Sequence, residues 1–190
     1  MPKPPLPLGA HELAHAQAHA LAKHAEVLAH QISQPTDPGL ILAYLVNAGL
    51  AIELYLKAFM ICARGGQVTS GHDLSELLAE FPTFLRKSFN TAYEAHPTAK
   101  SASIGLVAFR ISPTAPERPT SNSFTGRYTT FDEAVESLSD VFVESRYFFE
   151  RLVAPEWAIF SYPTDAISGV IHALEETYQI YKSGGFKGAA

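Results

Sequence analysis

The sequence predicts an all-α protein, an up-and-down bundle of about five helices with a long irregular insertion before the fourth. The first observation is that residues 40–63 are apolar at nearly every position, which is typical of a helix enclosed by others. The second is that amphipathic segments follow, with capping residues at their starts and glycine pairs as stops. With 190 residues and 47% hydrophobic content, we expect one domain with a substantial core.

The chain begins with a proline-rich segment, residues 1–9, which we expect to be an extended or disordered arm rather than a signal peptide. Residues 10–32 contain no proline or glycine and predict a helix. Its larger apolar side chains should share the core-facing side: Leu13, Leu21, Val27, Leu28 and Ile32.

The other side of this first helix should carry its histidines: His11, His15, His19 and His30. The i, i+4, i+8 spacing of the first three is able to bind Zn²⁺ or Ni²⁺. We interpret this side as a solvated polar face, so no physiological metal is expected.

A turn at residues 34–39 precedes the central helix, which should run from residue 37 or 38 to residue 64. Its length also suits a membrane span, but Glu53 and Lys57 near its middle would each cost roughly 3 kcal/mol in a bilayer. Their i, i+4 spacing instead favours an ion pair on a soluble helix. We therefore expect no membrane association and a cytoplasmic protein.

Gly65 and Gly66 should end the central helix, because glycine readily adopts the left-handed conformation that closes helices. After a short polar link, Asp73 is predicted to cap a third helix, with Glu76 completing a capping-box variant. That helix should extend to about residue 96 and be kinked or split at Pro82, since proline removes a backbone hydrogen bond. The short link makes the two helices antiparallel neighbours.

The insertion, residues 97–130, is rich in proline, serine and threonine, and only residues 104–111 alternate in the way that predicts a short strand. It also mixes basic with aromatic side chains: Lys100, Arg110, Arg118, Arg127, Phe124 and Tyr128. Such a mixture is able to hold a nucleic acid or nucleotide by phosphate contact and stacking, which makes Arg127 a candidate binding residue. We prefer to interpret the segment as an ordinary solvated insertion, because the basic residues are spread out.

The fourth helix should begin at a capping box formed by Thr130 and Glu133. Its apolar stripe consists of Phe131, Val135, Leu138, Phe142 and Phe149. Arg146 falls on this stripe, so its permanent charge needs a partner inside the bundle. We expect that partner to be Glu53, because the central helix should touch every other one.

The last helix should open at residues 161–163, with Pro163 in its first turn, and close at the glycines 184–185. Residues 184–190 are then a flexible tail. The single cysteine, Cys62, excludes an internal disulfide and is expected in the core.

Three short motifs in the middle of the chain occur in an informative order. Residues 53–58 read Glu-Leu-Tyr-Leu-Lys-Ala, residues 71–74 read Gly-His-Asp-Leu after a glycine-containing link, and residues 144–147 read Glu-Ser-Arg-Tyr. In this order they resemble the HEPN superfamily of helical bundles. The resemblance implies a bundle that dimerises. It also implies a link to RNA cleavage, to toxin–antitoxin pairs with nucleotidyltransferases, or to nucleotide binding.

The nuclease members of that superfamily carry an arginine followed after four to six residues by a histidine, and this sequence lacks that signature. After Arg146, the next histidine is His172, on another helix, and Arg64 precedes His72 by a longer, glycine-broken gap. Whether the chain is an enzyme therefore stays open. The sequence also has no P-loop and no Gly-x-Gly-x-x-Gly motif, so no cofactor is expected.

The expected function is a non-catalytic or degenerate HEPN-like module, in a homodimer, that binds RNA, a nucleotide or a partner protein. The alternative is a metal-independent endoribonuclease with a rearranged Arg/His site. A third option is a purely structural partner, such as the antitoxin or toxin half of a pair. The net charge of −5 excludes a protein that binds nucleic acid over its whole surface, although a local basic patch is compatible with it. The candidate binding residues are Arg146, His72, Glu53, Lys57, Tyr147, Asp73 and Arg127; none is assigned as catalytic.

Overall fold

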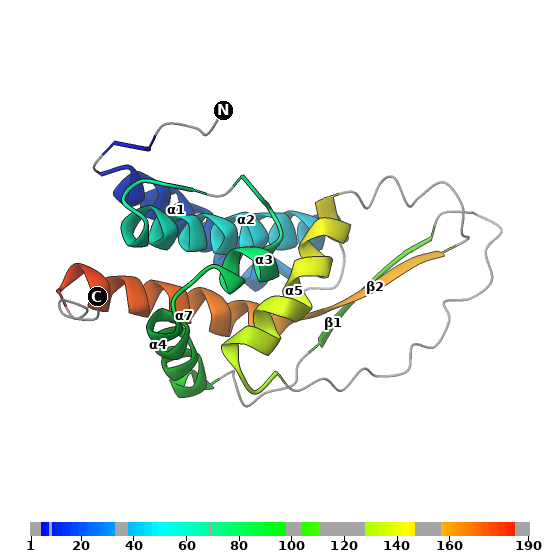
Figure 1. Cartoon of the computed structure of the whole chain (residues 1–190). Coiled ribbons are helices and arrows are strands. Elements are labelled where there is room, and N and C mark those ends of the chain that lie inside the picture. The colour runs from blue at the N-terminus through cyan, green and yellow to red at the C-terminus, as the bar shows by residue number, and fades with distance from the viewer. Residues whose placement is uncertain are drawn as a thin grey trace.

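The computed structural model describes residues 5–7, 9–32, 38–68, 70–97, 104–110, 128–146 and 157–184. Within these ranges the backbone alone is described at 38, 104–110, 140–141, 143–146 and 157–161. The described chain forms six helices and two strands, and its predicted all-α character is confirmed because helices dominate (Figure 1). In order, the elements are α1 (Ala10–Ile32), α2 (Pro38–Ala63), α3 (Leu74–Ala79), α4 (Thr83–Ala95), β1 (Ile104–Arg110), α5 (Phe131–Arg146), β2 (Trp157–Pro163) and α7 (Thr164–Lys182).

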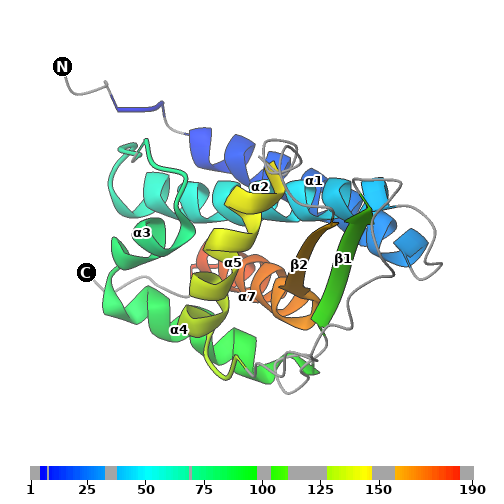
Figure 2. The same cartoon turned by 90° about the vertical axis from the view of Figure 1, so that its right-hand side faces the viewer.

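Helix α2 lies at the centre, as expected for a helix that is apolar on nearly every side. It contacts α1, α3, α5 and α7, and α5 crosses it at a steep angle (Figures 1 and 2). Phe59 of α2 also meets Phe89 of α4 edge to face, with ring centroids 5.0 Å apart. The other fully buried side chains of α2 include Leu45, Ala48, Ala51, Ile52, Tyr55, Leu56, Ala58 and Met60.

Among the described helices, α2 is the one that is long and apolar enough to cross a membrane, over Gly39–Ala63. Half of its most apolar window is buried inside the protein, and Glu53 and Lys57 form an ion pair within the same helix. The core helix of a soluble protein meets the same criteria. The absence of a membrane and the cytoplasmic location stay predictions.

The predicted orientation of α1 is wrong in part. Leu13 and Val27 were expected in the core, but their side chains are 64% and 54% exposed. Helix α1 instead buries Ala18 and Ala25 completely. Small alanine side chains allow α1 to lie close along α2, so burial follows the alanines rather than the largest apolar residues.

His15 shares this buried side of α1, which corrects its expected place on a solvated face. Its side chain is only 14% exposed, and its ring stacks on Tyr178 of α7, with centroids 3.7 Å apart and planes 15° apart. Its Nε2 lies 3.2 Å from Oε2 of Glu175, close enough for electrostatic attraction but not aligned for a hydrogen bond. Burial lowers the pKa of His15 below its ordinary value of 6.5, although Glu175 opposes the shift.

The predicted helix ends are confirmed at several positions. Gly65 and Gly66 follow α2 with φ of +59° and +93°. The chain splits at Pro82, which serves as the N-cap of α4. At the start of α5, the amide of Glu133 donates to Thr130 Oγ1 over 3.2 Å, and the amide of Thr130 donates to Glu133 Oε2 over 3.2 Å. This reciprocal pair is the capping box that the sequence predicts.

The described part of the N-terminal arm, residues 5–7, lies against the turn after α2. The amide of Leu6 donates to the carbonyl oxygen of Gly66 over 2.9 Å. A Cβ atom at Gly66 would come within 2.6 Å of the Leu6 carbonyl oxygen. Glycine is therefore required at this position both for its positive φ and for the close approach of the arm.

Strand β1 agrees with the predicted short strand, whereas its partner β2 was not predicted. The two strands pair antiparallel, from Ile104 opposite Pro163 to Arg110 opposite Trp157. Residues 161–163 were expected to open the last helix, but they end β2, and Pro163 is the N-cap of α7. The β-branched and aromatic residues before them favour a strand once a partner is present. The remainder of the predicted insertion, 98–103 and 111–127, lies outside the described residues.

Helix α5 packs on α2 at a close crossing between Gly49 and Phe142. A Cβ atom added at Gly49 would lie 2.6 Å from Cγ of the Phe142 ring. Four members of the apolar stripe predicted for α5, Phe131, Val135, Leu138 and Phe142, are buried. The fifth, Phe149, lies outside the described residues. The contact distance between the two helices is thus set by a residue without a side chain.

We predict that Gly49→Ala lowers the free energy of unfolding by up to about 2 kcal/mol. Overpacking costs about 1–3 kcal/mol, which outweighs the roughly 1 kcal/mol that alanine gains over glycine in a helix. Urea unfolding would measure the difference. In a Phe142→Ala background, which removes the two ring carbons nearest to the added methyl group, the same substitution should be neutral or stabilising. An equal loss in both backgrounds would refute the contact.

The buried His15 predicts a stability loss in mild acid. Below about pH 6.5 the unfolded chain binds a proton at His15 that the folded protein binds only at lower pH, so the free energy of unfolding falls as pH falls. Above about pH 6.5, His15 is neutral in both the folded and the unfolded protein, so its contribution to the free energy of unfolding does not change with pH. His15→Phe keeps the stack on Tyr178 and removes the titration, so it should lose less stability than wild type between about pH 7.5 and 5.5. His24→Phe, on the exposed side of α1, should behave as wild type in urea unfolding; equal losses in all three proteins would contradict the prediction.

Candidate functional site

Four of the predicted site residues come together where α2, α3 and α5 meet. Glu53 and Lys57 lie one turn apart on α2, and the glycine turn after α2 brings His72 and Asp73 back to them at the start of α3. The sequence motif of residues 53–58 followed by residues 71–74 thus corresponds to one place in the structure.

The carboxylate of Glu53 is the centre of this site. Its Oε1 accepts a hydrogen bond from Lys57 Nζ over 2.8 Å and lies 2.8 Å from His72 Nδ1. The side chains of Glu53 and Lys57 are 7% and 15% exposed, whereas that of His72 is 66% exposed. A buried carboxylate is costly without partners, and these two neighbours provide them.

This arrangement fixes the orientation of the His72 ring. An ionised carboxylate has no proton to donate and only accepts hydrogen bonds. In a hydrogen bond with it, the Nδ1 atom of His72 that faces Glu53 carries the proton. The other nitrogen, Nε2, lies on the opposite edge of a ring that is mostly exposed. His72 therefore presents one nitrogen to solvent while a buried group holds the other.

Asp73 is an N-cap, as predicted. Its Oδ1 accepts hydrogen bonds from the amides of Ser75 and Glu76, over 2.8 and 3.0 Å, and from Ser139 Oγ over 3.1 Å. With its oxygen engaged in capping, Asp73 positions the start of α3 and with it His72.

Ser139 of α5 belongs to the site but was not among the predicted residues. Its side chain is buried, and its Oγ accepts a hydrogen bond from the amide of Leu74 over 3.2 Å while donating to Asp73. The available signal was a hydroxyl residue directly after Leu138 on the apolar stripe of α5. This bridge fastens α5 to the beginning of α3.

The remaining predicted site residues are not placed by the described side chains. Arg146 is the last residue of α5, and only its backbone is described. Tyr147 and Arg127 lie outside the described residues. The expected contact between Glu53 and Arg146 stays a prediction.

No matching protein-family model, curated protein or solved structure was found for this chain.

Within the described ranges, no group of three or more His, Cys, Asp or Glu side chains is arranged to hold a metal ion. The described side chains of the site supply an oriented imidazole, a buried carboxylate and an ammonium group.

We predict that Glu53→Gln lowers the free energy of unfolding by about 3 kcal/mol, because it leaves the poorly exposed ammonium group of Lys57 without its counter-charge. The matched control is Glu26→Gln. Glu26 pairs with Lys23 over 2.8 Å, but both side chains are more than half exposed. The control should cost under about 1 kcal/mol. Thermal or urea unfolding that finds equal losses would show that burial does not determine the strength of the Glu53 interactions.

Proposed function

We propose that this chain is a HEPN-like helical module that binds RNA through the surface around His72, without cleaving it. The observation that carries the proposal is the Glu53–His72 pair, in which a buried carboxylate holds an exposed imidazole in a fixed orientation. The order of the motifs in the sequence supports the HEPN-like assignment. The proposal includes a homodimer, as the resemblance implies.

An imidazole held in this way is suited to contact with a phosphodiester. Its Nε2 donates to a phosphate oxygen when the ring is protonated, and it accepts from a ribose hydroxyl when the ring is neutral. Because Nδ1 is already held by Glu53, little conformational freedom is lost when RNA binds. The ammonium group of Lys57 is paired with the same Glu53 carboxylate and adds a positive charge there.

The overall charge of −5 limits how RNA binds. A protein with this charge makes few phosphate contacts, so we expect a shallow dependence of the affinity on salt concentration. Recognition would then depend on the geometry of the His72 surface more than on long-range attraction.

A second candidate function, metal-independent RNA cleavage, is favoured by the same geometry. In that reading Nε2 of His72 removes the proton from a ribose 2′-hydroxyl, and Glu53 stabilises the resulting imidazolium. An arginine, for which Arg146 is the candidate, would stabilise the charge that develops on the phosphate. The missing Arg-x4-6-His signature places this function second.

The test is fluorescence anisotropy with labelled single-stranded and hairpin RNAs at two salt concentrations. His72→Ala should weaken RNA binding about five- to tenfold, the loss expected for one phosphate contact. His24→Ala, which removes an exposed histidine from α1, is the matched control and should bind as wild type. Unchanged affinity in His72→Ala would overturn the proposed surface, and binding of free nucleotides or of a protein but not of RNA would overturn the assignment to RNA.

The two candidate functions are separated by incubating the same RNAs with the protein in EDTA and resolving the products on a gel. The binding module should leave the RNA intact. Cleavage that persists in EDTA and disappears in His72→Ala would replace it with the nuclease.

A further inference from the structure

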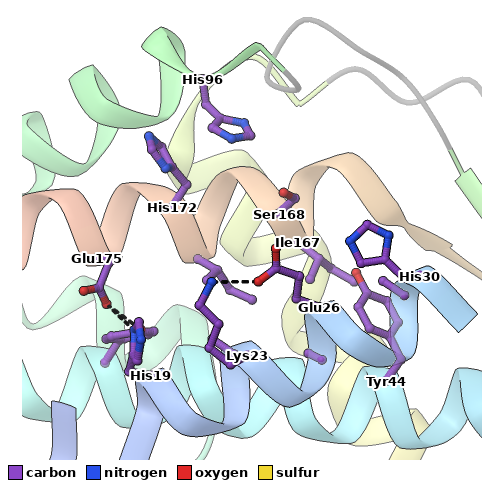
Figure 3. Close-up of a pocket in the computed structure, with 15 residues that line it drawn as sticks. His19, Lys23, Glu26, His30, Tyr44, His96, Ile167, Ser168, His172 and Glu175 are labelled. Atoms are coloured by element: carbon purple, nitrogen blue, oxygen red, sulfur yellow. Dashed lines mark hydrogen bonds and ion pairs between the residues drawn. The ribbon is translucent and has the colours of Figure 1, made fainter. Parts of the chain in front are cut away.

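A cavity of about 460 Å³ lies between α1, α2 and α7, beside the end of α4 (Figure 3). It is within the size range of small-molecule sites in proteins. Its apolar wall includes Ile167 and Ile171 of α7 and the alanines of α1, and polar side chains from α1, α2, α7 and the end of α4 also line it. Those from α1 are His19, Lys23, Glu26 and His30, all labelled in Figure 3.

One end of the cavity is built around Glu175, beside His19 (Figure 3). Tyr55 donates a hydrogen bond from its hydroxyl to Glu175 Oε2 over 2.5 Å, and Gln179 donates to Oε1 over 2.9 Å. Burial alone would raise the pKa of Glu175, but these hydrogen bonds and the nearby His15 and His19 hold it below its ordinary value. The carboxylate is therefore ionised at neutral pH and its position is fixed.

Two imidazoles, His96 at the end of α4 and His172 on α7, line the cavity about one turn of α7 away from Glu175 (Figure 3). Their ring centroids lie 4.4 Å apart, with the planes tilted by 42°. Burial and the neighbouring His172 lower the pKa of His96. A neutral imidazole offers one hydrogen-bond donor and one acceptor, so this part of the lining presents both kinds of group.

The charges of the lining decide which ligands fit. One ammonium group, Lys23, is bonded to Glu26 over 2.8 Å, and Glu175 is a second carboxylate. The lining is thus slightly negative when its imidazoles are neutral, which disfavours phosphate groups. Apolar walls together with mixed donors and acceptors instead suit a flat, uncharged heterocycle whose edge carries both donors and acceptors.

We propose that the cavity between α1, α2 and α7 binds an uncharged nitrogen heterocycle of nucleoside size, with the ring against Ile167 and Ile171 and its polar edge toward His96 and His172. The ribose hydroxyls, or their equivalent, face the polar end at Lys23 and Glu26. The nucleoside is preferred over its phosphates because the lining holds two carboxylates against one ammonium group.

This site is separate from the surface around His72 and does not rest on the proposed RNA binding. Tyr55 lines the cavity, whereas Glu53 holds His72. Residues two positions apart on a helix project about 200° apart, so the two sites lie on opposite sides of α2.

The test uses isothermal titration calorimetry of the full chain with adenosine, guanosine, cytidine and uridine, each beside its 5′-monophosphate. At least one nucleoside should bind, and its monophosphate should bind about tenfold more weakly or worse. Ala29→Trp places an indole in the cavity from an exposed position, and should abolish binding. Ala20→Trp, also exposed on α1 but outside the cavity, is the matched control and should bind as wild type.

His172→Ala should weaken nucleoside binding about tenfold, and His72→Ala should leave it unchanged. The proposal is overturned if none of the four nucleosides binds, if Ala29→Trp binds as the control does, or if a monophosphate binds more tightly than its nucleoside in His72→Ala, which lacks the proposed phosphate contact at the other site. Loss of nucleoside binding in His72→Ala would overturn the separation of the two sites.

Discussion

The structure depends on the need to enclose α2. A helix with apolar side chains around most of its circumference exposes hydrophobic surface unless other elements cover every side. Helices α1, α3, α5 and α7 contact it directly, and α4 reaches it through the aromatic contact of Phe59 with Phe89. Because so many elements end or cross at one helix, polar residues placed on α2 are brought next to side chains from distant parts of the sequence. Glu53 and Tyr55 are the two clearest cases, one on each side of α2.

Burial has a different consequence for each of these two residues. Glu53 is an acidic side chain in a nearly buried position, and its contacts with Lys57 and His72 offset the cost of its desolvation. Tyr55 is buried with its hydroxyl bonded to Glu175, and burial together with that bond raises its pKa. The tyrosine therefore remains a neutral hydrogen-bonding group, whereas the Glu175 carboxylate, whose pKa its hydrogen-bond donors and nearby imidazoles lower, remains charged.

Sequence reasoning found the elements whose ends are determined by local chemistry. Gly65, Asp73, Pro82 and the Thr130–Glu133 box each act within a few residues, so the boundaries that they predict are confirmed. Features that depend on a distant partner were missed. Strand β2 forms only because it pairs with β1, which is far away in the sequence. The orientation of α1 depends on how closely its alanines approach α2, and this cannot be predicted from the positions of its larger apolar side chains.

The candidate sites show the same division. The spacing of Glu53 and Lys57 predicts their ion pair, because both lie on one helix. The spacing of residues in the sequence does not predict that His72 contacts the same carboxylate. Nor does it predict that Ser139 joins Asp73 to Leu74. The cavity was missed because it is formed by α1, α2, α4 and α7 together, and none of these segments carries a recognisable motif by itself.

The close crossing of α2 and α5 has an evolutionary consequence. Gly49 and Phe142 share a space that admits one large ring and no second side chain. In related chains with the same helix crossing, a larger residue at position 49 is compatible only with a smaller one at position 142. Amino-acid identities at these two positions should therefore covary, although they are far apart in the sequence, and such covariation would trace the α2–α5 crossing through chains too divergent for the short motifs to be recognised.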